Sequence, residues 1–254
     1  MPSVNHGKKE VLLKLVYYGP GLGGKTTNLE WIHEHSSPEH RGKLLSLTNE
    51  TERTLFFDLL PVALGTFRGY SVRLHLCTVP GQVRYDKTRR LILRHVDGVV
   101  FVVDSQPMAI EANVEALHNL AVNLRLQGDD PDRVPVVVQY NKRDLPDALP
   151  VRELSGWLGV PRGVTCLEAS AINGRGVLET LKTIVTQCMK LVGDPKQAKQ
   201  GRTPSILPGR RESMYPAAIP PTVRSRPPPE REQLVLPQVP SAPRVPSVTD
   251  LDDE

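Results

Sequence analysis

The sequence has little cysteine and no long apolar run, and these absences limit what the protein can be. Its 254 residues include only three cysteines, Cys77, Cys166 and Cys188. They are odd in number, far apart and set among apolar residues, so we expect buried, reduced thiols rather than disulfides or metal ligands. No apolar stretch is long enough to span a bilayer, and there is no signal peptide, N-terminal myristoylation motif or C-terminal prenylation box. We therefore expect a soluble cytoplasmic protein without an integral membrane segment.

The chain also lacks a concentrated block of basic residues. Its formal net charge is only +4 at pH 7, and the basic surplus is shared along the sequence. A protein that binds nucleic acid usually gathers lysine and arginine on one face or in one segment. The charge distribution therefore predicts no nucleic-acid partner.

Composition divides the chain into a globular part and a tail. From Pro195 to Glu254 the sequence is crowded with Pro, Arg, Ser and Gln and has no periodic apolar face. Such a segment cannot bury enough apolar surface to order itself. We predict one domain at 1–194, large enough for a single core, and a disordered tail at 195–254. A solvated tail is the preferred interpretation, and a proline-rich segment that docks on a partner is the alternative.

One glycine-rich motif carries the strongest chemical signal. Gly19-Pro-Gly-Leu-Gly-Gly-Lys25-Thr26 follows the apolar run Val11–Tyr18 and precedes Thr27–His35, which can continue as a helix. In this context backbone amides wrap a polyphosphate at the N-terminus of a helix. The Lys25 ammonium would contact the β- and γ-phosphates, and the Thr26 hydroxyl would ligate Mg²⁺. The predicted phosphate contacts are Gly19, Gly21, Leu22, Gly23, Gly24, Lys25, Thr26 and Thr27.

Alternating strand-like and helix-like segments predict the fold class. The strand-like runs are Val62–Phe67, Val72–Val79, Gly98–Asp104, Val134–Tyr140 and Val164–Leu167. Apolar residues recur at helical spacing from Ile110 to Leu124 and from Val177 to Val192. The turn Arg68–Ser71 is short enough to join its flanking strands as an antiparallel hairpin. We predict an α/β, three-layer P-loop NTPase fold, with a mostly parallel sheet, one antiparallel strand and helices on both faces.

A second motif, Asn141-Lys-Arg-Asp144, indicates which base is bound. It directly follows a predicted strand, so its side chains lie at the carboxyl end of the sheet, where such folds bind nucleotides. The Asp144 carboxylate can accept hydrogen bonds from N1 and the 2-amino group of guanine, whereas adenine offers no donor at either position. Asn141 would brace the loop, and the Lys142 stem would lie along the base. Downstream, the backbone of Glu168-Ala-Ser170-Ala171 is placed to contact the base at Ser170 and Ala171.

These three motifs, in this order, resemble the Ras-like small GTPases over about residues 10 to 192. Thr78-Val-Pro-Gly81-Gln82 stands where those proteins carry aspartate, two variable residues, glycine and glutamine. The resemblance implies that the Gly81 amide binds the γ-phosphate and that Gln82 orients the attacking water. Thr78 departs from the pattern, because a neutral hydroxyl cannot supply the usual charge near Mg²⁺. Asp58 is an available substitute carboxylate, although a solvated or capping side chain is the preferred interpretation there.

The segment Leu47–Phe57, between the first helix and the next strand, contains the first switch. Thr54 is the candidate that senses the γ-phosphate through Mg²⁺, and Arg53 is a candidate arginine finger supplied within the same chain. On the residues alone, a solvated Arg53 side chain is slightly preferred. Phe56 and Phe57 are either part of a partner surface or, more ordinarily, buried strand residues.

Several segments together are similar to the bacterial MglA gliding-motility GTPases. They are Thr-Glu-Arg-Thr at 51–54, Phe-Phe at 56–57, Thr-Val-Pro-Gly-Gln at 78–82 and Asn-Lys-Arg-Asp-Leu-Pro at 141–146. The resemblance implies a switch that controls cell polarity and motility, with a catalytic pair at Arg53 and Gln82. Thr26 and Thr54 are the predicted Mg²⁺ ligands. Because phosphoryl transfer depends mostly on positioning and charge stabilisation, we expect GTP hydrolysis to be slow without a partner. The resemblance also implies a roadblock-type (MglB-like) activator, downstream effectors and recruitment to a cell pole. It does not cover the tail.

Two other functions stay open. An ATPase or kinase would share the phosphate loop but has no use for Asn141 and Asp144 as placed. A GTP-binding scaffold with negligible hydrolysis, docking partners through its tail, is the more serious alternative, because Thr78 replaces the usual aspartate.

Overall fold

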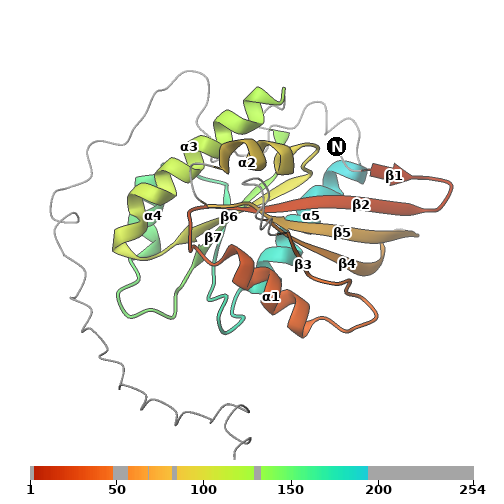
Figure 1. The fold of residues 1–254 in the computed structure, drawn as a ribbon, viewed down its shortest axis with the longest axis horizontal. Coiled ribbons are helices and arrows are strands. Elements are labelled where there is room, and N and C mark those ends of the chain that lie inside the picture. Colours follow the sequence, from red (N-terminus) through yellow and green to blue (C-terminus); the bar gives the residue numbers. More distant parts are fainter. Residues whose placement is uncertain (1–2, 48–56, 68, 82–84, 129–132, 194–254) are drawn as a thin grey trace, which may run out of the picture.

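The computed structural model describes residues 3–47, 57–67, 69–81, 85–128 and 133–193. Within these residues one sheet lies between two layers of helices (Figure 1). The strands are β1 (Ser3–Asn5), β2 (Glu10–Tyr18), β3 (Leu45–Leu47), β4 (Phe57–Phe67), β5 (Tyr70–Thr78), β6 (Gly98–Asp104), β7 (Val136–Asn141) and β8 (Thr165–Glu168). The helices are α1 (Lys25–His35), α2 (Asp86–Leu93), α3 (Ile110–Leu126), α4 (Val151–Leu158) and α5 (Val177–Gly193), with a short 3-10 helix, η2, at Pro107–Ala109.

The strand order is β3-β4-β5-β2-β6-β7-β8, with β1 paired to the first residues of β2. Parallel pairings join β5, β2, β6, β7 and β8, whereas β4 runs antiparallel to β5. The predicted fold class is therefore confirmed, including the hairpin between β4 and β5. The sequence pattern does not predict β1 and β3, which add antiparallel pairings at β2 and β4, because three residues carry too little periodicity.

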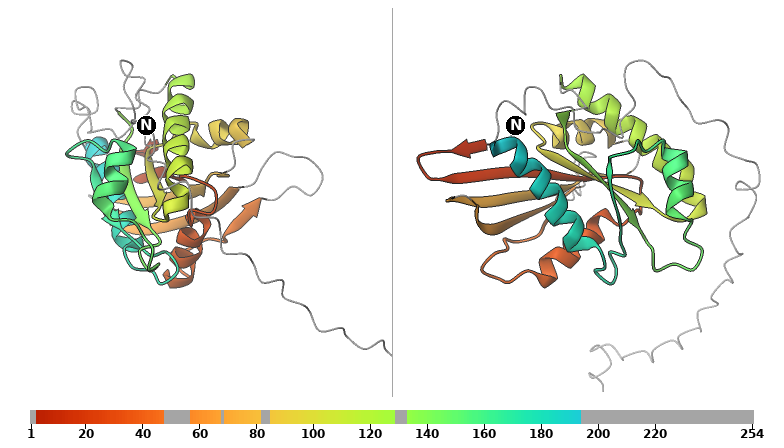
Figure 2. Two further views of the ribbon diagram at one scale, coloured as in Figure 1. Left: turned by 90° about the vertical axis from the view of Figure 1, so that its left-hand side faces the viewer. Right: turned by 180° about the vertical axis from the view of Figure 1, so that it is seen from behind.

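The sheet buries apolar side chains on both faces. On β2, Val16 and Tyr18 pack into the core formed with α2, α3 and α4, whereas Leu13 and Leu15 pack into the core formed with α1 and α5. This alternation follows from the two-residue period of a strand. Figure 1 shows α2 and α3 on one side of β2 and α1 on the other, and the view from behind in Figure 2 shows α5 crossing the strands.

The cysteine prediction is correct for two positions and wrong for one. All three cysteines are free thiols, and Cys77 and Cys188 are buried, but Cys166 is exposed. Cys166 lies on β8, the last strand in the order, and nothing pairs with the outer side of that strand in the part of the chain that the structure describes. None of the described helices is both long enough and apolar enough to cross a membrane.

The loops that follow the parallel strands lie at one edge of the sheet. The last residues of β6 and β7 are in register, Asp104 opposite Asn141, and Tyr140 of β7 stands opposite Glu168 of β8. Since β2 runs parallel to β6, the loop after Tyr18 leaves at the same edge. In open α/β sheets, ligands bind outside these carboxyl ends.

Candidate nucleotide-binding site

The phosphate loop connects the end of β2 to the start of α1. Gly24 is the N-cap of α1 and has a φ of 91°, in the left-handed region. A Cβ at Gly24 would lie 2.3 Å from Nδ2 of Asn141, so both backbone conformation and space require glycine. No acidic side chain occupies the first turn of α1. The positive end of the helix dipole is therefore available to an anion.

Lys25 is folded against the loop that precedes it. Its Nζ donates to the carbonyl oxygens of Gly19 at 3.1 Å and Pro20 at 2.5 Å, and only 7% of the residue is exposed. Burial, assisted by the charge of Arg89, lowers the pKa of Lys25 to about 8 against the opposing effect of Asp58. A bound polyphosphate would add negative charge beside this ammonium and so raise the pKa of Lys25.

Asp58 joins three hydroxyl groups beside the phosphate loop. Its Oδ2 accepts hydrogen bonds from Thr26 Oγ1 at 2.7 Å and from Thr78 Oγ1 at 2.9 Å, and its Oδ1 accepts one from Ser46 at 2.8 Å. The Asp58 residue is 8% exposed. The preferred interpretation from the sequence, a solvated or capping side chain, is therefore wrong. The pairing of β4 with β5 places the carboxylate against Thr78, the position where the aspartate is missing.

The oxygen atoms around Thr26 fit a bound Mg²⁺. This cation prefers hydroxyl, carboxylate and phosphate oxygens, and proteins usually hold it through one or two carboxylates together with substrate phosphates. The Thr26 hydroxyl and the buried Asp58 carboxylate provide such a donor set next to the phosphate loop. Thr54, the other predicted ligand, lies outside the described residues.

Asn141 connects the phosphate loop to the loop that follows β8. Its Nδ2 donates to the Gly23 carbonyl at 2.9 Å, and its Oδ1 accepts from the Ala171 amide at 2.9 Å. Asn141 is 1% exposed, so these bonds are made in the interior. The amide side chain satisfies one group on each loop and fixes their separation. Three motifs far apart in the sequence are thus brought together by one side chain.

Asp144 and Lys142, the predicted base contacts, lie in the loop that follows β7. Ser170 Oγ donates to Asp144 Oδ1 at 2.5 Å, while Asp144 itself is exposed. Lys142 has a φ of 64°, and its ammonium contacts Asp104 Oδ2 at 2.7 Å and Gln106 Oε1 at 2.9 Å. The sequence motifs do not identify Asp104 and Gln106 as site residues. The position of Asp104 at the end of the strand next to β7 is the feature that could have indicated them.

A second group missed from the sequence is a buried polar chain below the phosphate loop. Asn28 Nδ2 donates to the Gly24 carbonyl at 2.8 Å, and Gln139 Nε2 donates to Asn28 Oδ1 at 3.0 Å and to Thr180 Oγ1 at 3.1 Å. Thr180 in turn donates to the Gly176 carbonyl at 2.7 Å. All three side chains belong to residues that are 0% exposed. In the sequence, these three polar residues interrupt otherwise apolar helix and strand patterns, and this interruption could have indicated a buried polar network.

The predicted switch residues are only partly within the described chain. Arg53, Thr54, Gln82 and Phe56 lie outside it. Gly81 is described, and a Cβ there would lie 2.3 Å from the Gly21 amide nitrogen, so its backbone rests directly on the phosphate loop. Phe57 is half-buried and packs against the core on the α2, α3 and α4 face, which supports the strand interpretation.

The fold and this arrangement define a class of protein. A phosphate loop entering a helix, an Asn-Lys-x-Asp loop after a parallel strand and a third loop bound to its asparagine are the parts of a small GTPase domain. Comparisons with known proteins agree: the model of the ADP-ribosylation factor family matches residues 45–188.

Individual relatives narrow the assignment. Mutual gliding-motility protein MglA of Myxococcus xanthus is 53% identical over 184 residues, which cover 72% of this chain and 94% of that protein. Human ADP-ribosylation factor-like protein 4C is 27% identical over 74% of this chain and 93% of its own length. Elongation factor 4 of Parabacteroides distasonis is 26% identical over 78% of this chain but only 30% of its own length. The chain therefore belongs to the ADP-ribosylation factor family of small GTPases and groups there with MglA. Small GTPases bind GTP, hydrolyse it and generally use Mg²⁺ with it.

Proposed function

We propose that this protein is a GTP-hydrolysing molecular switch in gliding motility, where it controls cell polarity through nucleotide-dependent partner binding. The observation that carries the nucleotide part is the Asn141 side chain, which binds Gly23 of the phosphate loop and Ala171 of the loop that follows β8 at one edge of the sheet. The motility part rests on the 53% identity to a protein named for gliding motility.

Guanine recognition is assigned to Asp144, oriented by Ser170. The carboxylate would accept from N1 and the 2-amino group, and a site built on such bonds rejects a base that lacks the donors. The test compares binding of fluorescent GTP and ATP to the unmodified protein and to the Asp144→Asn variant. We expect a strong preference for GTP that the substitution weakens. Equal binding of the two nucleotides by the unmodified protein would refute the guanine assignment.

Turnover is assigned to both switches acting on the phosphates. Bound Mg²⁺, held by Thr26 and Thr54 with Asp58 behind them, would neutralise charge on the β- and γ-phosphates. Lys25 would bind the same oxygens, Gln82 would orient the attacking water, and Arg53 would stabilise the transferring phosphoryl group. Thr54 and the Gly81 amide would be held by the γ-phosphate and released after hydrolysis, which changes the surface offered to partners.

We assign the slow step to the ordering of Arg53 and Gln82 and its acceleration to a roadblock-type activator. Phosphate release is measured with the unmodified protein, Arg53→Ala and Gln82→Ala, each with and without that activator. Both variants should keep GTP binding and lose the stimulated rate. A variant with the full stimulated rate removes its residue from the mechanism. We also propose that the protein is cytoplasmic and is recruited to a cell pole. Imaging a fluorescent fusion in cells tests this location.

A GTP-binding scaffold with negligible hydrolysis is the second candidate, favoured by Thr78 in the place of aspartate. The buried Asp58 side chain argues against it, because its carboxyl group accepts a hydrogen bond from the Thr78 hydroxyl and so lies next to the position that lacks the aspartate. If phosphate release stays at the background rate with several activators while GTP remains bound, the scaffold is favoured.

The domain organisation belongs to the same proposal: a GTPase domain at 1–194 and a disordered tail at 195–254. Deleting the tail after Asp194 should leave nucleotide turnover unchanged. A change in cellular location alone would assign the tail to partner docking, and no change in either property would remove that role.

A further inference from the structure

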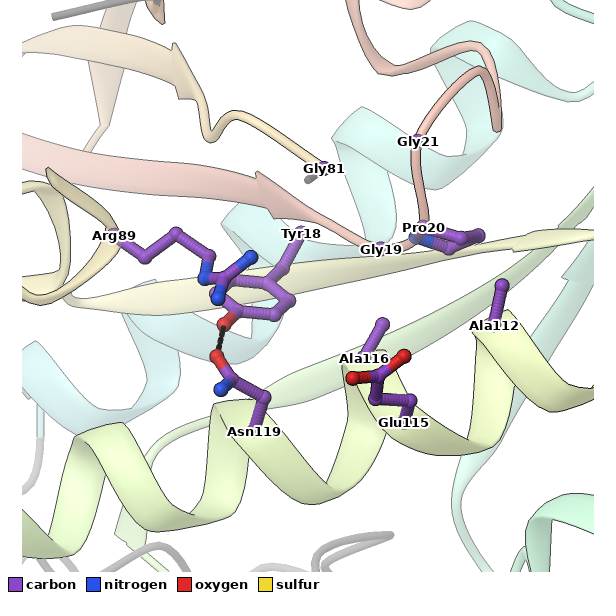
Figure 3. Close-up of a pocket in the computed structure, with 10 residues that line it drawn as sticks. All are labelled: Tyr18, Gly19, Pro20, Gly21, Gly81, Arg89, Ala112, Glu115, Ala116 and Asn119. Atoms are coloured by element: carbon purple, nitrogen blue, oxygen red, sulfur yellow. Dashed lines mark hydrogen bonds between the residues drawn. The ribbon is translucent and has the colours of Figure 1, made fainter. Parts of the chain in front are cut away.

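Four side chains form a polar cluster between β2, α2 and α3, which we call the α2–α3 cluster: Tyr18, Asp86, Asn119 and Asn123. Tyr18 Oη donates to Asn119 Oδ1 at 2.6 Å (Figure 3). Asn123 Nδ2 donates to the same Asn119 oxygen at 2.8 Å and to Asp86 Oδ1 at 3.0 Å. Asn119 Nδ2 reaches Asp86 Oδ1 at 3.3 Å. The cluster therefore joins the end of β2 to the first residue of α2 through α3.

The cluster is mostly withdrawn from water and its protonation is defined. Tyr18 is 1% exposed and Asn123 is 0% exposed. Burial raises the pKa of Tyr18, so the phenol stays a donor. Burial works to raise the pKa of Asp86 as well, but the amides of Asn123 and Asn119 and the charges of Arg89 and Arg90 outweigh it and hold that pKa below its usual range. Asp86 is therefore an ionised acceptor, and hydrogen bonds to a charged group are the stronger ones.

The position of the cluster along the chain gives it a functional meaning. Tyr18 directly precedes Gly19, the first residue of the phosphate loop, and Asp86 is four residues beyond Gln82. On the other side of Gln82, the backbone of Gly81 rests on Gly21 of the phosphate loop. Gly81, Gly21, Tyr18 and Asn119 line one cavity of about 40 Å³ (Figure 3). The described residues on either side of Gln82, Gly81 and Asp86, are thus both connected to the phosphate loop, Gly81 by direct contact and Asp86 through the cluster.

We infer that the α2–α3 cluster is a positioning device that holds the start of α2, four residues after Gln82, in place relative to the phosphate loop. The inference rests on the proposed GTPase function and adds to it four positioning residues that contact no phosphate. A catalytic side chain displaced by about 1 Å can lose a hundredfold in rate, so anchoring the start of α2 affects turnover directly. The cluster links that anchor to the residue that begins the phosphate loop. We expect nucleotide affinity to depend on the loop amides and the base contacts and to be independent of the cluster.

Simple packing predicts a different response. If the four side chains only stabilise the domain, loss of one hydrogen bond lowers the melting temperature and affects binding and turnover together. If they hold the start of α2 in the position that hydrolysis needs, the rate of turnover falls while nucleotide affinity is unchanged. Tyr18→Phe separates these outcomes, because it removes one hydroxyl and keeps the buried ring. Asp86→Asn keeps the shape of the side chain, 37% of which is exposed, and removes the charge at the other end of the cluster together with its ion pairs to Arg89 and Arg90.

The experiment measures single-turnover GTP hydrolysis and the Kd for GDP. Tyr18→Phe and Asp86→Asn should each slow hydrolysis about fivefold, the effect of one hydrogen bond on a barrier, with the Kd unchanged. The double variant should be little slower than either single variant, because the residues belong to one network. Tyr70→Phe is the matched control: it also removes a bonded hydroxyl, the one 2.9 Å from His6 Nδ1, but at the start of β5. It should hydrolyse GTP at the unmodified rate.

Three results would overturn the inference: single variants with the unmodified rate, single variants whose rate and Kd change in proportion, or a double variant whose effects multiply. In each case the unmodified protein still hydrolyses GTP and the proposed function stands. An unmodified protein that binds GTP without hydrolysing it would overturn the proposed function and this inference together.

Discussion

Replacing Asp58 by asparagine is the sharpest test of how this protein compensates for Thr78. The substitution keeps the shape of the side chain and removes its negative charge. Oδ2 of Asp58 accepts hydrogen bonds from the hydroxyls of Thr26 and Thr78, and the group is 8% exposed, so little solvent screens it. If Asp58 supplies the charge behind the metal, Asp58→Asn must weaken Mg²⁺ binding.

The size of the effect follows from the contacts. The loss of a partner behind a metal ligand typically lowers metal affinity by about 10- to 100-fold. A 10- to 100-fold change corresponds to ~1.4 to 2.8 kcal/mol. That range is comparable to one hydrogen bond to a charged group, about 1.5 to 3 kcal/mol, and Asp58 receives two such bonds on the oxygen that faces Thr26. We therefore expect the Mg²⁺ concentration that half-protects bound nucleotide to rise by at least about tenfold.

The assay follows the release of fluorescent GDP while Mg²⁺ is varied. Ser46→Ala is the matched control, because Ser46 donates to the other oxygen of the same carboxylate at 2.8 Å and its removal leaves the charge in place. We expect a large shift of the midpoint for Asp58→Asn and a small one for Ser46→Ala. Coincident midpoints for Asp58→Asn and the unmodified protein would refute the reasoning, and so would an equal shift in both variants.

The remaining predictions concern the phosphate loop and the residues that support it. Gly24→Ala should weaken GDP binding about tenfold or more, measured by titration, because a Cβ would lie 2.3 Å from the Asn141 amide at a φ of 91°; Gly156→Ala in α4, with open space around it, should bind normally and melt slightly higher. Lys25, with a pKa of about 8 in the free protein, should take up a proton when phosphates bind, so nucleotide affinity should fall as the pH rises above about 8. The binding enthalpy measured by calorimetry at this pH should then depend on the ionisation enthalpy of the buffer. A binding enthalpy that is the same in all buffers would contradict this. Gln139→Leu should speed GDP release and lower the free energy of unfolding by about 1 to 3 kcal/mol, because Asn28 and Thr180 lose their shared donor; an unchanged release rate would show that the buried chain does not support the phosphate loop.

The sequence predicts best those features that depend on neighbours along the chain. The strand, loop and helix around Gly19 to Lys25 form one contiguous motif, and its φ requirements are visible as glycines. The surroundings of Asp58 could not be predicted in this way, because they depend on how β4 pairs with β3 and β5: the register sets Asp58 opposite Ser46 and brings its amide to the Thr78 hydroxyl. The exposure of Cys166 has a similar origin, since an apolar run does not reveal that its strand is the last one of the sheet within the described residues.

Strand β7 explains how the nucleotide motifs are held as one unit. Gln139 and Asn141 are two residues apart, so they share a face of the strand. Asn141 binds Gly23 and Ala171, and Gln139 binds Asn28 of α1, which itself holds the Gly24 carbonyl. The phosphate loop and the loop that follows β8 are therefore positioned from one strand, on the face that carries α1 and α5.

The α2–α3 cluster lies across the sheet, because Tyr18 packs into the core of the opposite face. Substitutions on the two faces should consequently have separable effects. Gln139→Leu should raise the rate of nucleotide release with little change in the hydrolysis rate of bound GTP, whereas Tyr18→Phe should slow hydrolysis and leave release unchanged. The two hydrogen-bond networks share no side chain. In the proposed switch, α2 can therefore be repositioned without loss of the contacts that we expect to retain the nucleotide.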